Sequence, residues 1–160
     1  INLARHFKGT GHIVRFIEYM DVGTLNRWKL DDVVSANEIV SMISNEMPLD
    51  PIESNYQGEV ATRYRYRDGT GEIGVIASVT KPFCGDCTRL RLSPDGTIYT
   101  CLFASHGTDL RGHMRAGATD SELAELVTQR WQIRDDRYSE DRSSMTKPMS
   151  KKVEMYHIGG

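Results

Sequence analysis

The spacing of three cysteines constrains this chain more than any other feature of its sequence. Two residues separate Cys84 from Cys87, and thirteen more separate Cys87 from Cys101. Because three is an odd number, these cysteines cannot complete a disulfide framework, and a disulfide-stabilised secreted fold is disfavoured. Thiolate chemistry, with a metal or as a redox pair, is therefore the first question that the sequence raises.

The residues between the second and third cysteine predict a β-hairpin. Residues 89–92 alternate with a period of two, Ser93-Pro94-Asp95-Gly96 supplies turn chemistry, and residues 97–102 return along the chain. Such a hairpin brings Cys101 back beside the Cys84–Cys87 loop at a small loop-closure cost. Three thiolates can then converge on one centre.

Three occupants of that centre compete. The first is a structural zinc ion held by the three cysteines and by His106, which stands at an acceptable spacing from Cys101. The second is a three-cysteine iron-sulfur cluster with one iron open to substrate. The third is a redox dithiol of thioredoxin type, which is disfavoured because a hairpin follows the motif where that fold has a helix. Spacing alone favours the zinc ion and leaves unrelated free thiols as a remainder.

Two arginines on the predicted hairpin strand shift this balance. Arg89 and Arg91 are two residues apart, so on a strand they share one face beside the metal site, while Leu90 and Leu92 are expected to turn inward. Paired guanidinium groups suit a phosphate or a purine edge. The same alternation at residues 63–67 (Arg63, Arg65, Arg67) is better explained as a solvated sheet face.

The first part of the chain has the pattern of an α/β fold. Residues 13–20 are rich in β-branched and aromatic side chains and predict a strand that ends at a turn. A capping box at Ser35-Ala36-Asn37-Glu38 predicts a helix that Pro48 ends, with Ile39 and Ile43 on its apolar face. The segment 49–57, with its prolines, is the expected domain boundary.

The second part changes character. Asp68-Gly69-Thr70-Gly71 separates two extended runs, residues 59–67 and 72–80, and predicts a further hairpin. A capping box that begins at Thr119 predicts a helix whose apolar face carries Leu123, Leu126, Val127 and Trp131. Residues 135–152 are charged and rich in serine, and we expect them to form a flexible tail that residues 153–160 close.

Charge and hydropathy exclude several partners. Twenty Lys and Arg against 22 Asp and Glu give a net charge of -2, so no global field attracts nucleic acid or an anionic membrane. No apolar run approaches the roughly 20 residues of a membrane span, and the N-terminus has no signal-peptide pattern, which favours a cytoplasmic protein. The chain begins at Ile1 in the middle of a helical pattern, so we expect a fragment or a processed piece.

The cysteine segment and three flanking features resemble one known family. The run from Pro82 to Gly96 with the following Cys101-Leu102-Phe103, the strand from Arg15 to Gly23, and the terminal Gly159-Gly160 resemble molybdenum cofactor biosynthesis protein A, the radical-SAM GTP 3',8-cyclase. Essentially the whole chain resembles the C-terminal half of such an enzyme, a lyase.

This resemblance implies roles for particular residues. Cys84, Cys87 and Cys101 would hold the family's auxiliary [4Fe-4S] cluster, whose open iron contacts the guanine base of GTP. Arg89, Leu90 and Arg91 would line the GTP site. Met20 would help to hold S-adenosylmethionine, with Arg15 a weaker candidate for the same cavity. Gly159 and Gly160 would insert towards the active site.

The resemblance also implies a fold and a set of partners. Residues 1–57 would end an incomplete TIM-like α/β barrel, and residues 58–160 would form an α+β region that carries the cluster and GTP. The family's CxxxCxxC motif, which binds the cluster that cleaves S-adenosylmethionine, is absent, so the chain should not turn over alone. Its partners would be GTP, S-adenosylmethionine and the missing N-terminal half, with a homodimer left open. The alternative from another class is a non-catalytic zinc-binding module (Cys84, Cys87, Cys101 and His106).

Overall fold

The computed structural model describes residues 1–23, 25–142 and 152–158. The chain divides into two compact units: the first comprises Ile1–Met20 and Trp28–Cys87, and the second Asp21–Arg27 and Thr88–Gly160. The first unit therefore includes the expected boundary segment 49–57. Within the described residues, no helix combines the length and apolar character that crossing a membrane requires.

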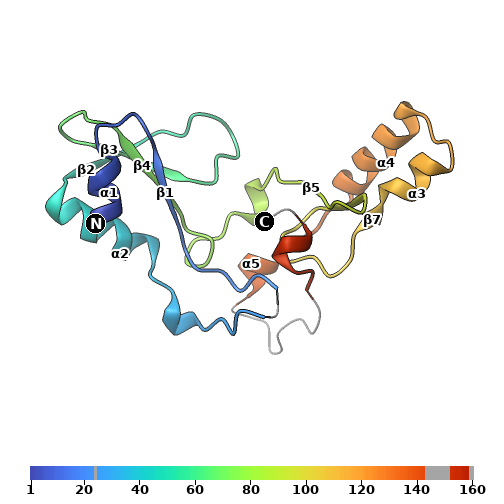
Figure 1. The fold of residues 1–160 in the computed structure, drawn as a ribbon, viewed down its shortest axis with the longest axis horizontal. Helices are drawn as coiled ribbons and strands as arrows, with labels where there is room; N and C mark the ends of the chain where they lie inside the picture. The colour runs from blue at the N-terminus through green and yellow to red at the C-terminus, as the bar shows by residue number, and fades with distance from the viewer. Residues whose placement is uncertain (24, 143–151, 159–160) are drawn as a thin grey trace. The chain divides into compact units, whose positions relative to one another are not determined.

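The first unit is built on a four-stranded mixed sheet (Figure 1). The strand order is β1-β4-β3-β2, in which β1 pairs parallel with β4 and the other neighbours pair antiparallel. Its elements are α1 (Asn2–Phe7), β1 (Val14–Ile17), a 3₁₀ turn η1 (Leu30–Asp32), α2 (Ala36–Glu46), β2 (Leu49–Ile52), β3 (Thr62–Tyr66), β4 (Glu72–Ile76) and a 3₁₀ turn η2 (Cys84–Asp86).

Local sequence signals account for these elements. Both halves of the predicted capping box at Ser35 and Glu38 are present at the start of α2, which ends at Glu46 before Pro48. The hairpin predicted around residues 68–71 is the antiparallel pair of β3 and β4. The described strands form an open sheet with β1 and β2 at its edges, so a mixed α/β fold is confirmed, and no closed barrel is observed among the described residues.

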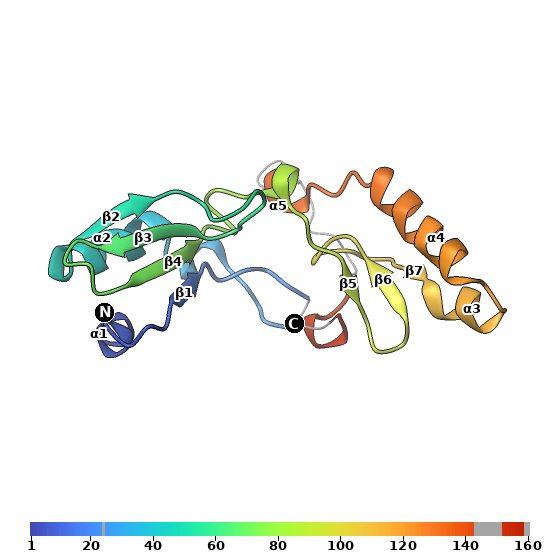
Figure 2. The ribbon, with the colours of Figure 1, turned by 90° about the horizontal axis from the view of Figure 1, so that it is seen from above.

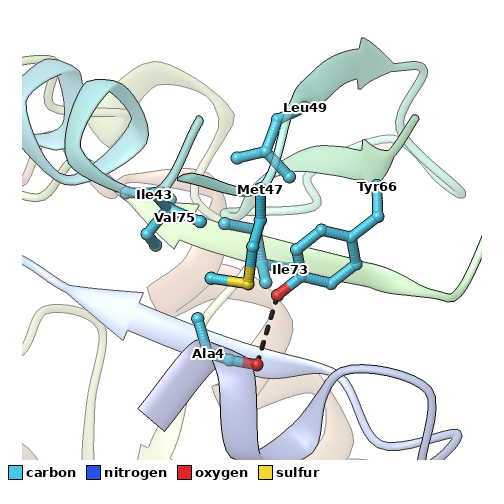
Figure 3. Close-up of a cluster of buried hydrophobic side chains, with 7 residues drawn as sticks. All are labelled: Ala4, Ile43, Met47, Leu49, Tyr66, Ile73 and Val75. Atoms are coloured by element: carbon cyan, nitrogen blue, oxygen red, sulfur yellow. Dashed lines mark hydrogen bonds between the residues drawn. The ribbon is translucent and has the colours of Figure 1, made fainter. Parts of the chain in front are cut away.

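One face of this sheet buries the hydrophobic core. Ile73 and Val75 alternate along β4, and their side chains are each 1% exposed. Ala4 of α1 and Ile43 of α2 join them, so both helices contribute to the cluster (Figure 3). The hydroxyl of Tyr66 donates a hydrogen bond to the carbonyl of Ala4 at 3.4 Å, which gives this buried polar group a partner.

The second unit carries a three-stranded antiparallel sheet in the order β5-β6-β7, with helices α3 and α4 (Figure 2). Its elements are β5 (Arg91–Leu92), β6 (Thr97–Tyr99), β7 (Thr108–Asp109), α3 (Leu110–Arg115), α4 (Asp120–Gln132), α5 (Tyr138–Asp141) and a 3₁₀ turn η3 (Met155–His157). The predicted hairpin is the pair of β5 and β6. Gly96 has φ +80° in its turn, a conformation that glycine adopts without strain.

Helix α4 has the cap and the face that its sequence predicts. Thr119 and Glu122 form both halves of a capping box. The four apolar residues of the predicted face are partly buried, whereas most of their neighbours on the helix are exposed (Leu123, Leu126, Val127 and Trp131). The apolar stripe therefore faces the rest of the protein.

Residues 135–142 and 152 of the expected flexible tail have more structure than their composition indicates, and residues 143–151 of that tail lie outside the described residues. Residues 138–141 form α5, and the amide of Val153 donates a hydrogen bond to the carbonyl of Ala104 at 3.0 Å. Ile158 is 1% exposed. The physical reason is that Arg142 and Lys152 meet the half-buried carboxylate of Asp21. Gly159 and Gly160 lie outside the described residues.

Candidate functional site

Cys84 and Cys87 are presented by one tight turn. Residues 84–86 form the 3₁₀ turn η2, and the amide of Cys87 donates a hydrogen bond to the carbonyl of Cys84 at 3.3 Å. Cys87 is the C-cap of this turn and has extended backbone angles, so both cysteines belong to one short, hydrogen-bonded segment. Both cysteines are half-buried and neither forms a disulfide.

Cys101 lies in the second unit, two residues after β6. Its Sγ atom accepts a hydrogen bond from the amide of Phe103 at 3.4 Å, a contact that stabilises a thiolate. Cys101 also lines a cavity of about 400 Å³ together with His106, Arg130 and Tyr138. The cavity gives Cys101 space for a further ligand or for a bound group.

The predicted ligand set is divided between the two units. Cys84 and Cys87 belong to the first unit and Cys101 belongs to the second. Within the described parts of the chain, no three His, Cys, Asp or Glu side chains form a group that could hold a metal ion. Convergence of the three thiolates therefore stays a prediction.

The arginine pair occupies the start of the second unit. Arg89 is exposed and Arg91 is half-buried at the start of β5, where it pairs with Tyr99. The expectation that the two leucines turn inward is wrong, because Leu90 is 38% and Leu92 is 58% exposed. Strand β5 is an edge strand of two residues, which is too short to impose an alternating burial pattern.

Met20 and Arg15 belong to the first unit. Met20 is half-buried three residues after the end of β1. Arg15 lies on β1 opposite Gly74, where a Cβ atom would approach the Cγ of Arg15 to 3.2 Å. The Nη2 of Arg15 is 3.9 Å from Oε1 of Glu59, whose side chain is 2% exposed. Gly74 therefore leaves room for Arg15 to extend across the sheet towards a buried carboxylate.

Arg63 on β3 and Arg67 directly after it have structural partners. Arg63 donates hydrogen bonds to Glu72 at 2.6 Å and to Asn55 at 2.7 Å, and Arg67 donates to Asp50 at 2.9 Å. This agrees with the prediction that they serve the sheet rather than a ligand site. Arg63 is nevertheless less solvated than expected, with a side chain that is 16% exposed.

Glu18 is a buried carboxylate that sequence reasoning missed. Its residue is 1% exposed, directly after β1. Oε1 accepts hydrogen bonds from the amide of Ala36 at 2.7 Å and the hydroxyl of Thr80 at 2.5 Å, and Oε2 accepts from the amides of Val79 at 2.7 Å and Thr80 at 2.8 Å. Burial opposes ionisation, but these four donors outweigh it and lower the pKa of Glu18. A charged residue inside a β-branched run was the available signal.

Asp21 is a second missed carboxylate, and it belongs to the second unit. It accepts hydrogen bonds from the Tyr138 hydroxyl at 2.5 Å and from Lys152 Nζ at 2.8 Å, and it pairs with Arg142 at 2.8 Å. Burial opposes ionisation of Asp21, but Lys152, Tyr138 and Arg142 outweigh it and lower its pKa. Burial and the neighbouring carboxylate raise the pKa of Tyr138. The ring of Phe103 stacks on Tyr138 with centroids 4.5 Å apart.

Comparisons with known proteins agree with the resemblance of the cysteine segment. Residues 12–140 match the family model described as Molybdenum Cofactor Synthesis C. The chain is 50% identical to the GTP 3',8-cyclase of Acidothermus cellulolyticus, over 99% of this chain and 50% of that protein. It is 51% identical to the enzyme of that name from Xanthomonas campestris pv. campestris, over 99% of this chain and 46% of that protein. It is 45% identical to the one from Staphylococcus aureus strain Newman, over all of this chain and 48% of that protein.

These matches define the class of protein. A mixed α/β chain with a cysteine-bearing turn matches over most of its length a family of molybdenum cofactor synthesis. The chain belongs to the Molybdenum Cofactor Synthesis C family and corresponds to the C-terminal part of GTP 3',8-cyclases. It spans about half the length of the curated relatives that it matches.

Proposed function

We propose that this chain is the part of a GTP 3',8-cyclase that holds an auxiliary [4Fe-4S] cluster and orients GTP. The observation that carries the proposal is the donor set. Cys84 and Cys87 lie on one turn, and Cys101 borders a cavity and accepts an amide hydrogen bond. Three thiolates free of disulfides are the ligands that an iron-sulfur cluster selects. The residues present therefore fit the cluster.

Within this proposal the protein's own side chains fix the substrate at two ends. Cys84, Cys87 and Cys101 would hold the cluster, and the cluster would supply an iron to which the guanine base could bind. Arg89 and Arg91, with Leu90 between them, hold the substrate by charge and by bidentate hydrogen bonds. Fixed orientation is the main requirement for a substrate that must meet a radical at one carbon.

The remaining proposed roles concern the other ligand and the rest of the enzyme. Met20, with Arg15 as a weaker candidate, would contact S-adenosylmethionine, and Gly159-Gly160 would approach the site from the C-terminus. Residues 1–57 would complete an α/β barrel begun by an N-terminal half or by a separate N-terminal chain. Because all three cysteines are assigned to one cluster, these 160 residues alone should bind substrate and not convert it.

One observation favours a second candidate function, a structural zinc module. His106 lines the same cavity as Cys101 and stands at a spacing that zinc sites use. A zinc ion held by three cysteines and His106 would be fully ligated and would leave no position for a nucleotide.

The metal and sulfide content of oxygen-free protein separates the two candidates. If the cluster is present, the purified protein should be brown and contain about four irons and four sulfides per chain. Cys101→Ser should abolish the brown colour and the iron, and His106→Ala should keep both. One zinc ion per chain without sulfide, lost on His106→Ala, would establish the zinc module instead. The arginine assignment has its own test, because Arg89→Ala and Arg91→Ala should each weaken GTP binding, and unchanged affinity in both would refute it.

A further inference from the structure

We infer that Glu18 is the residue that positions the Cys84–Cys87 turn. The inference rests on the proposed function only for the identity of the group that the turn binds. The carboxylate of Glu18 joins three separate parts of the first unit. These are the end of β1, the first residue of α2, and the turn that follows β4. None of these contacts involves a residue with a role assigned above.

The backbone of Glu18 is held by the sheet. The amide of Glu18 donates a hydrogen bond to the carbonyl of Ile76 at 3.1 Å, which continues the pairing of β1 with β4 beyond the last residue of the strand. Its backbone is thereby fixed to the sheet. The side chain then reaches the amide of Ala36, where the N-terminus of α2 favours a negative charge.

The turn after β4 is organised around the same carboxylate. The amides of Val79 and Thr80 both point at Oε2, and the hydroxyl of Thr80 reaches Oε1. The amide of Lys81 donates to the carbonyl of Ala77 at 3.2 Å, so residues 77–81 close into one turn. Ser78 within this turn is 4% exposed. The turn is therefore held by hydrogen bonds and by one buried residue, Ser78, although Thr80 and Lys81 are exposed.

From this turn to the first cysteine the chain is short and stiff. Three residues separate Thr80 from Cys84, and a chain of that length spans at most about 14 Å. One of the three is Pro82, which fixes its own φ and restricts Lys81 before it. The short link with its proline therefore limits how far Cys84 can move relative to Thr80.

The chemistry of the contacts argues that Glu18 positions rather than reacts. Each carboxylate oxygen already accepts two hydrogen bonds, and all four donors are neutral. A carboxylate with both oxygens occupied in this way has no lone pair directed at a substrate. The same donors lower the pKa of Glu18, which makes it a weak proton acceptor at neutral pH. Met20 follows only two residues later, so the segment carrying the proposed S-adenosylmethionine contact departs from the same anchor.

Variants of Glu18 and Thr80 in the 160-residue chain test the inference. Glu18→Gln keeps the shape but turns an amide NH₂ towards donors. Thr80→Val removes one hydroxyl, Thr80→Ser retains it, and Glu72→Gln is a matched control that breaks the pair with Arg63 elsewhere in the sheet. The rate of amide hydrogen exchange at Val79 and Thr80 measures how well the Glu18 carboxylate holds these two amides. In a Cys101→Ser background without metal, the reaction rates of Cys84 and Cys87 with a thiol reagent report the turn.

In Glu18→Gln we expect exchange at Val79 and Thr80 to be faster by about tenfold or more. Reaction of the two thiols should be faster as well, and reconstituted protein with an intact Cys101 should lose iron to a chelator several-fold faster. Thr80→Val should show the same changes to a smaller degree, while Thr80→Ser and Glu72→Gln should behave as the parent chain. Thr80→Val decides the matter where Glu18→Gln fails to fold.

Faster exchange at Val79 and Thr80 with unchanged thiol reactivity would overturn the inference, because Glu18 would then stabilise the fold without placing the cysteines. A parent chain that takes up no iron and sulfide would instead overturn the proposed function. The thiol measurement would still decide the role of Glu18 in that case, since it requires no cluster.

Discussion

Glu18 is a buried carboxylate and Asp21, three residues later in the sequence, is a half-buried one, and the two are neutralised in opposite ways. Glu18, in the first unit, accepts four hydrogen bonds from backbone amides and one hydroxyl. Asp21, in the second unit, is met by the cations Arg142 and Lys152 and by the hydroxyl of Tyr138. Both have a lowered pKa, one through neutral dipoles and the other through charges.

This difference follows from what each carboxylate holds. Glu18 organises segments of one unit whose amides would otherwise be buried without partners. Asp21 contacts Tyr138, Arg142 and Lys152, which come from a part of the sequence with too few apolar residues to pack by itself. The two cations also lie against the rings of Tyr138 and Phe103, with Lys152 Nζ 4.4 Å from the Tyr138 centroid. Charge thus replaces hydrophobic burial as the anchor of the C-terminal segment.

The largest effect should come from Glu18→Gln. Its amide nitrogen would face buried donors, so we expect the free energy of unfolding to fall by about 3 kcal/mol. Urea unfolding, followed by a signal from the first unit, measures this loss of unfolding free energy, with Glu72→Gln as the control. A loss no greater than that of the control would mean that neutral dipoles do not hold this carboxylate as described.

Asp21→Asn should have a smaller and more local effect, because Arg142 and Lys152 keep their contacts with the aromatic rings. We expect a loss of about 2 kcal/mol and faster amide exchange at Val153, whose hydrogen bond to Ala104 holds the same segment. Asp50→Asn removes an exposed pair between Asp50 and Arg67 and should change the free energy of unfolding much less, because solvent screens that pair. Equal losses in the two variants would remove Asp21 from its anchoring role.

Acid should weaken both contributions, and Glu18 should respond first. A carboxylate whose pKa is lowered by folding contributes its full stability above its ordinary pKa, which is 4.5 for Glu18 and 3.8 for Asp21. The contribution is lost as pH falls from there through the folded value, because the unfolded chain binds the proton more readily. The stability difference between the parent chain and Glu18→Gln should therefore be constant from pH 7 to 5 and narrow below about 4.5. A difference that widens in acid would reverse the assigned direction.

Salt should change stability least of all these tests, but it should distinguish Asp21 from Glu18 most clearly. Raising the ionic strength from about 0.05 M to 1 M screens charge pairs that are in contact with solvent. The effect of Asp21→Asn should shrink by about 0.5 kcal/mol, whereas that of Glu18→Gln should stay unchanged because its partners carry no charge. Equal salt dependence in the two variants would erase the distinction between them.

The sequence predicted the elements whose signals are local. The capping boxes at Ser35 and Thr119 and both hairpins are observed, since each depends on residues that are neighbours in the chain. Burial on β5 was predicted incorrectly because alternation needs a longer strand. The sequence did not predict that Tyr138, Arg142 and Lys152 are held in place, because the residue that they contact, Asp21, lies more than a hundred residues away.

The candidate site divides in the same way. A short turn that carries Cys84 and Cys87 follows locally from their spacing and is observed, whereas their role as a ligand pair stays a prediction. Glu18 could not be assigned, because its partners are contributed by the start of α2 and by the turn after β4. An isolated charge within an apolar strand indicates a buried partner, but only the fold identifies that partner.

The account depends most directly on whether the three thiolates hold a cluster that receives a guanine nucleotide. The decisive measurement is the electron paramagnetic resonance spectrum of the reduced, reconstituted chain, recorded with and without GTP. We predict a cluster signal that GTP shifts, that CTP leaves unchanged, and that is absent from Cys101→Ser. A cluster signal identical with and without GTP, or one that survives Cys101→Ser unaltered, would contradict the account.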